Sequence, residues 1–73
     1  MNKSIYSSEH KFLISQLKKV RIATGLNQST VAKLLDKTQS YISKIESGER
    51  RIDIVQLKEF ARIYKKKVDF FIK

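Results

Sequence analysis

The sequence of 73 residues contains no cysteine and only one histidine. Without cysteine, disulfide scaffolds, cysteine-ligated zinc and thiol catalysis are excluded. The single histidine, His10, cannot build a multi-histidine metal site. Uninterrupted apolar runs are at most three residues long, which excludes a transmembrane helix and a signal-peptide core. We therefore expect a soluble, cytoplasmic protein without a cofactor or metal.

Residues that make turns are also scarce. Proline is absent and glycine occurs twice, at Gly25 and Gly48. A sandwich or barrel of short strands is therefore not expected, whereas helices joined by tight corners are. A chain of this length allows one small domain, and 41% hydrophobic residues suffice for a core. We expect an all-α, compact bundle of four to five short helices over residues 8–73, preceded by an N-terminal arm over residues 1–7.

Capping residues and apolar spacing place the first two helices. Ser7 or Ser8 can cap a first helix, which Gly25 ends. Asn27 can cap a short second helix over residues 28–35.

The same signals place the rest of the bundle. Thr38 can cap a third helix, which the second glycine stops. Asp53 and Gln56 have the spacing of a capping box, which opens a fourth helix that runs to about Tyr64. A last helical turn is expected over residues 68–72.

Acidic residues are few, and the formal net charge is +9. Such an excess indicates a polyanionic partner, either nucleic acid or an anionic membrane. The charge is unevenly distributed, because residues 1–35 carry +5, residues 36–48 carry zero and residues 49–73 carry +4. A membrane-binding peptide would instead place basic and apolar residues on opposite faces of one long helix. Here the apolar residues are spread over several capped helices, so no membrane partner is expected.

The third expected helix has an unbroken polar face. A rotation of about 100° per residue places five polar side chains within an arc of about 140°, and these are Gln39, Ser40, Ser43, Lys44 and Ser47. Their amide, hydroxyl and ammonium groups can bond base edges. The pattern also fits an ordinary amphipathic surface helix. A short helix and a corner precede it, however, and this is the helix-turn-helix arrangement that seats its second helix in the major groove.

These two helices resemble the Cro/repressor, or XRE-type, helix-turn-helix family. The resemblance rests on the Gly-Leu-Asn-Gln opening, on Ala32, and on Gln-Ser-Tyr-Ile-Ser-Lys-Ile-Glu followed by Gly48. It extends over residues 14–72. It implies a lambda-repressor-like bundle of five helices that binds DNA as a two-fold homodimer.

The resemblance also implies roles for single residues. Gln28 would contact phosphate and buttress the first residue of the recognition helix, while Arg21 and Glu46 match an ion pair between the first and third helices. The residues that would face bases are Gln39, Ser40 and Lys44. Those that would lie at the DNA backbone are Asn27, Gln28, Thr38, Ser43 and Ser47. From their position directly after this helix, two further residues are expected at phosphate or in the minor groove, namely Arg50 and Arg51.

Two corners depart from the family. Asp36 stands where the family often has glycine and Lys37 where it often has an apolar residue, so this corner is expected to be looser or more basic. Lysines at positions 65–67 replace the usual glycine stop, which leaves the placement of residues 68–72 open. These lysines either reach phosphate or form a solvated run of charge.

Some apolar residues exceed what the helical stripes need. They either complete a small core or form a dimer interface, and they are Val55, Ile63, Phe70, Phe71 and Ile72.

Enzymatic activity is not expected. No nucleophile has an obvious base partner, no glycine-rich phosphate loop exists, and no carboxylate pair has a cleft. We predict a transcriptional regulator of the repressor or controller type that binds a palindromic operator as a homodimer at the nucleoid. The alternative is an antitoxin-like or other protein-interaction module with weak or non-specific DNA binding, whose partner would be a protein such as a toxin.

Overall fold

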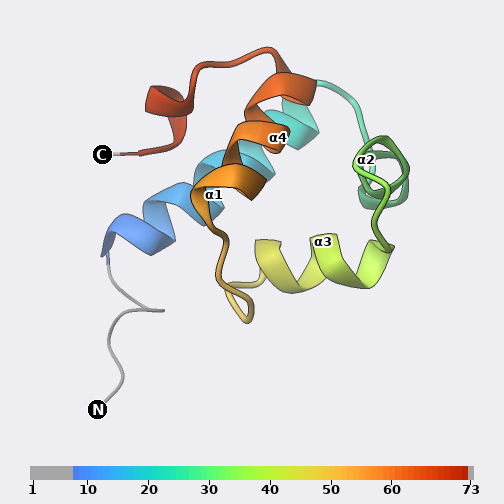
Figure 1. Ribbon diagram of the computed structural model, residues 1–73, viewed down its shortest axis with the longest axis horizontal. Helices are drawn as coiled ribbons and strands as arrows, with labels where there is room; N and C mark the ends of the chain where they lie inside the picture. The colour runs from blue at the N-terminus through green and yellow to red at the C-terminus, as the bar shows by residue number, and fades with distance from the viewer. Residues whose placement is uncertain (1–7, 73) are drawn as a thin grey trace.

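The computed structural model describes residues 8–72. These residues form four α-helices and a short 3-10 helix without any strand (Figure 1), namely α1 (Ser8–Ala23), α2 (Gln28–Leu34), α3 (Gln39–Glu46), α4 (Ile54–Tyr64) and η2 (Val68–Phe71). The expected all-α bundle is thereby confirmed. The N-terminal arm and the Ser7 cap lie outside the described residues.

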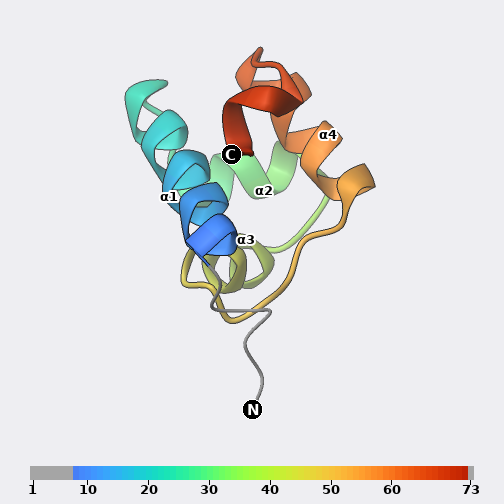
Figure 2. The same cartoon turned by 90° about the vertical axis from the view of Figure 1, so that its left-hand side faces the viewer.

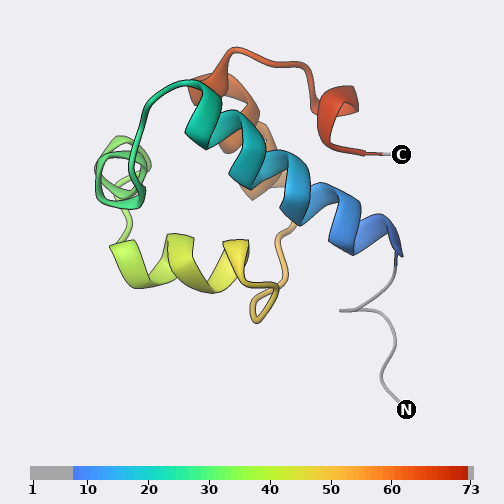
Figure 3. The same ribbon diagram turned by 180° about the vertical axis from the view of Figure 1, so that it is seen from behind.

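Helix α3 lies at one edge of the molecule (Figure 1). In Figure 1, α3 runs along the lower edge, α2 is seen almost end-on beside its N-terminus, and α4 crosses in front of α1. Seen from the side, α1 and α4 rise on either side of α3 (Figure 2). The C-terminal η2 returns to α1, where the Gln16 side-chain amide donates to the Phe70 carbonyl at 3.0 Å (Figure 3).

Every described helix contributes to one core. The apolar stripes expected from helical spacing supply it, because side chains three or four residues apart face the same side. The buried residues are Leu17, Val20, Val31, Ala32, Ile42, Ile45, Leu57, Phe60, Ala61, Tyr64 and Phe71. On α3 the apolar side faces this core, so its polar side is left at the surface.

The helix starts match the capping prediction. Asn27 Oδ1 accepts from the Thr30 backbone N–H at 2.8 Å, and Thr38 Oγ1 accepts from the Tyr41 N–H at 3.1 Å. At α4 both halves of the capping box form, with distances of 2.8 and 2.9 Å. Each bond satisfies an N–H that has no partner within its own helix.

The ends of α2 and α4 form without glycine. Asp36 and Lys65 each adopt a left-handed conformation with φ of 58°. After α4, the Lys66 N–H bonds the Ala61 carbonyl at 2.9 Å, and after α2 the Lys37 N–H bonds the Ala32 carbonyl at 2.8 Å. These are the bonds of a Schellman motif. The corner after α2 is therefore closed by hydrogen bonds rather than loose, and α4 stops where a glycine would have stopped it.

Candidate nucleic-acid interface

The polar face of α3 is exposed along the whole helix. All five of its side chains are exposed, namely Gln39, Ser40, Ser43, Lys44 and Ser47, whereas Ile42 and Ile45 on the opposite side are fully buried. An α-helix with its side chains is about 10–12 Å in diameter, and the major groove of B-DNA is about 12 Å wide. The helix thus presents uncharged donors and acceptors and one ammonium group on a surface that fits a major groove.

A buried ion pair holds α3 against α1. Arg21 Nε lies 2.7 Å from Glu46 Oε2, and Arg21 Nη2 donates to Glu46 Oε1 at 3.0 Å. The two side chains are 12% and 4% exposed. The hydrogen bond to Glu46 raises the pKa of Arg21. A bidentate pair with this geometry compensates the carboxylate for its loss of water, so the orientation of α3 is fixed from the inside.

Two glutamines extend this pair to the first residue of α3. Gln28 Nε2 donates to Glu46 Oε1 at 3.1 Å, and Gln39 Nε2 donates to Gln28 Oε1 at 3.2 Å. The second N–H of Gln39 and its carbonyl oxygen have further hydrogen-bonding capacity. A donor and an acceptor in this arrangement match the N7 and N6 groups of adenine.

The residues expected at the DNA backbone differ in the hydrogen bonds that their side chains already make within the protein. The side-chain oxygens of Asn27 and Thr38 accept the cap bonds, and both residues are exposed. Ser43 is also exposed. The Ser47 hydroxyl lies 3.1 Å from the Lys44 carbonyl and 3.1 Å from the Glu49 carboxylate, so its hydrogen is used within the protein.

An aromatic ring at the edge of the polar face lies beside two cations. The Arg50 guanidinium carbon is 4.9 Å and the Lys37 Nζ is 5.3 Å from the centre of the half-buried Tyr41 ring. Burial raises the pKa of Tyr41 most; Arg50 lowers it, and Glu59 and Asp53 raise it further. Helical spacing cannot show a contact across the following loop, so the sequence does not predict this cluster.

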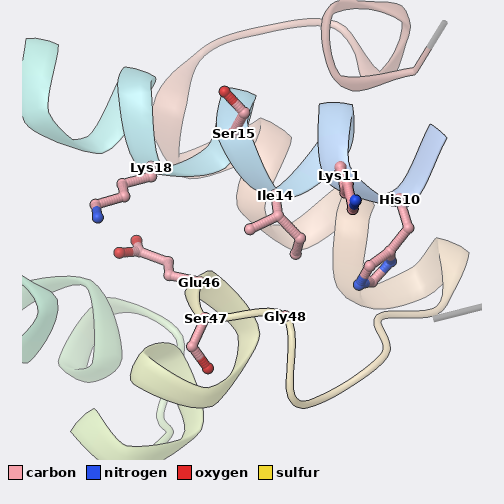
Figure 4. A pocket seen from close by; sticks show the side chains of 8 residues that line it. All are labelled: His10, Lys11, Ile14, Ser15, Lys18, Glu46, Ser47 and Gly48. Atoms are coloured by element: carbon pink, nitrogen blue, oxygen red, sulfur yellow. The ribbon is translucent and has the colours of Figure 1, made fainter. Parts of the chain in front are cut away.

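Arg51, the other arginine of that loop, is exposed and close to α1. The pKa of His10 is lowered, first by burial and then by the charge of Arg51. A shallow pocket of about 330 Å³ lies beside His10, between α1 and the end of α3 (Figure 4). Its lining residues are His10, Lys11, Ile14, Ser15, Lys18, Glu46, Ser47 and Gly48.

The candidate dimer residues do not share one environment. Val55, Ile72 and Phe70 are 62%, 49% and 36% exposed, and Ile63 is partly buried against the core. Phe71 is fully buried and completes the core, which is the first of the two alternatives for it, so it is not available to a partner. A short 3-10 turn can direct adjacent side chains to opposite sides, which helical spacing does not resolve.

Three further apolar residues are exposed outside the set predicted from the sequence, namely Ile22, Leu34 and Ile54, at 60%, 56% and 56%. Among residues 8–72 no cluster of histidine, aspartate and glutamate could hold a metal ion. In the same residues no helix has both the length and the apolar character needed to cross a membrane.

Comparison with known proteins places this geometry among helix-turn-helix domains. A model of the helix-turn-helix family matches residues 17–71. A comparison with curated proteins gives no significant match. Among solved structures, the chain is similar to the restriction-modification controller protein C.AhdI from Aeromonas hydrophila, at 27% identity and a TM-score of 0.76. The match covers 82% of this chain and 87% of that one.

Two further structures are similar at 19% identity and a TM-score of 0.82 each, which shows the fold alone. They are apo-HppE, with coverage of 90% of this chain and 37% of that one, and hydroxypropylphosphonic acid epoxidase from S. wedmorenis in complex with fosfomycin, with coverage of 92% and 36%. The likeness is therefore to about a third of each of those chains.

Proposed function

The chain belongs to the XRE-type helix-turn-helix family of DNA-binding regulators, and from this premise we propose that it binds a palindromic operator as a homodimer. The observation that carries the proposal is the chain of contacts Arg21–Glu46–Gln28–Gln39, which fixes the first residue of the polar face from the interior of the domain. The similarity to a restriction-modification controller protein supports a repressor or controller role.

The proposed mechanism is occupancy of the operator. Each α3 enters a major groove and directs Gln39, Ser40 and Lys44 at base edges, with the two half-sites about 34 Å apart, one turn of DNA. Backbone contacts by Asn27, Gln28, Thr38, Ser43 and Ser47 set the register, while Arg50 and Arg51 add charge at phosphate. A chromosomal target of this kind places the protein in the cytoplasm, at the nucleoid.

Selection of bound duplexes from a random DNA pool tests this function. We expect a palindromic consensus with half-sites about one helical turn apart. Binding that is sensitive to salt but yields no consensus would contradict the operator and favour the alternative, a protein-interaction module such as an antitoxin.

For the homodimer, we propose that exposed apolar residues of α4 and the C-terminal turn form the interface, with Val55 as the test position. Val55→Asp would place a charge in an apolar contact. We expect this variant to sediment as a monomer and to bind the palindrome only as tightly as a half-site. Ile22→Asp is the matched control, since Ile22 on α1 is 60% exposed and Val55 62%. Equal effects of both variants would contradict this interface.

A further inference from the structure

Three separate segments bring cations and an aromatic ring together at one edge of α3. Lys37 comes from the corner before the helix, Tyr41 from its first turn, and Arg50 from the loop after it. The Lys37 ammonium and the Arg50 guanidinium each lie about 5 Å from the centre of the same ring. At this distance each cation is attracted by the negative face of the ring.

The two cations keep their charge available for an external anion. Within residues 8–72 neither Lys37 nor Arg50 takes part in an ion pair. The carboxylates of Asp53 and Glu59 act on the Tyr41 hydroxyl, but they form no salt bridge with either cation. Two like charges near one ring repel each other, and a phosphate bound close to both would offset that repulsion.

The position of the ring relates this charge to the polar face of α3. Around the axis of α3, the Tyr41 side chain lies about 60° beyond that of Lys44, which is the last side chain of the polar arc. Tyr41 therefore borders the polar face. When the polar face lies against base edges, the border of the helix lies towards the sugar-phosphate backbone. Long cationic side chains lose rotamer freedom when they bind phosphate, and side chains already held at a ring lose less of it.

We propose that Tyr41 is a positioning residue whose ring holds Lys37 and Arg50 for the backbone phosphates beside the polar face of α3. Lys37 thereby becomes a phosphate-binding residue. The inference rests on the proposed function only in that α3 faces duplex DNA, since phosphate contacts are independent of base sequence.

The test compares Tyr41→Leu with Tyr41→Phe on a short duplex of arbitrary sequence. Fluorescence anisotropy gives the dissociation constant at several salt concentrations. Tyr41→Phe keeps the ring and is expected to bind within about twofold of the wild type, whereas Tyr41→Leu is expected to bind about fivefold more weakly. The slope of log K against log salt should become shallower by about 1 to 2 in the leucine variant alone.

A double-mutant cycle separates positioning from packing. Lys37→Gln should weaken binding less in the Tyr41→Leu protein than in the wild type, since the ring no longer holds the ammonium group. Lys19→Gln, which removes an exposed lysine of α1, should have the same effect in both proteins. Thermal unfolding reports packing, and a variant that only loosens the fold would lower Tm with an unchanged salt slope.

Two results would overturn the inference. One is a Tyr41→Leu protein with the affinity and salt slope of the wild type. The other is a Tyr41→Phe protein as weak as Tyr41→Leu, which would assign the effect to the hydroxyl. The operator proposal is judged separately by the selected consensus, so its failure leaves this comparison intact. A wild-type protein that binds no duplex at all would overturn both.

Discussion

Lys65 ends α4 in a backbone conformation that non-glycine residues seldom adopt. Its φ of 58° brings the side-chain Cβ close to the backbone, and the left-handed region costs an L-residue about 1–2 kcal/mol. Lysine carries no local signal for this conformation, so the sequence predicts the end of α4 near Tyr64 but leaves the placement of residues 68–72 open. Burial of Phe71 beyond the turn offsets the cost, because the turn at Lys65 directs η2 back to α1.

This conformation gives a stability prediction. Lys65→Gly should raise the free energy of unfolding by about 0.5–1 kcal/mol, since glycine has no Cβ penalty but loses more backbone entropy on folding. Urea denaturation measures the change. Lys66→Gly is the matched control at a neighbouring lysine without a positive φ, and it should lose stability. A gain of the same size in both variants would contradict this explanation.

Arg21 and Glu46 pair at a largely buried position, where a charge without a partner of opposite sign is destabilising. We expect Arg21→Met to lower the free energy of unfolding by about 3–5 kcal/mol, because it leaves the Glu46 carboxylate buried and unpaired. The double variant with Glu46→Leu should recover most of that loss, since no buried charge remains. Urea denaturation at low temperature checks both. A loss below about 1 kcal/mol for Arg21→Met would show that the pair is solvated.

At the scale of elements, local signals predicted the helices well and contacts between helices poorly. The caps at Asn27, Thr38 and Asp53 fix helix starts through bonds within four residues, and such short-range bonds can be read from spacing. The contact of Arg50 with Tyr41 depends on the path of a loop, for which the sequence has no periodic signal. The Arg21–Glu46 pair is predicted by the family resemblance and not by the spacing of residues within either helix.

The link between α2 and α3 can be tested at Gln28. Gln28→Ala removes the acceptor of Gln39 Nε2 and one donor to Glu46, and it leaves the Arg21–Glu46 pair in place. We expect discrimination at the base pair read by Gln39 to fall by about 1 kcal/mol, the size of one hydrogen bond. Competition binding with substituted operators measures it. Gln16→Ala, which removes an exposed bond to η2, should leave discrimination unchanged, and equal losses in both would contradict the link.

For the whole molecule, the distribution of charge matches the arrangement of the helices. The chain carries a net charge of +9, but residues 36–48 carry a net charge of zero. This segment contains α3 with its exposed polar face. The flanking segments carry +5 and +4. Phosphate contacts supply affinity that depends on salt, and base contacts supply specificity. We therefore propose that the charged flanks provide affinity and the neutral helix provides specificity.

The most direct test of this claim compares Gln39→Ala with Arg51→Ala on a selected operator and its single base-pair substitutions at two salt concentrations. Gln39→Ala should lose about 1–3 kcal/mol of discrimination at particular base pairs, with the salt dependence unchanged. Arg51→Ala should weaken binding to every duplex alike and reduce the salt slope by about 1. A uniform loss of affinity in both variants, with discrimination intact in each, would contradict the claim that α3 reads the sequence.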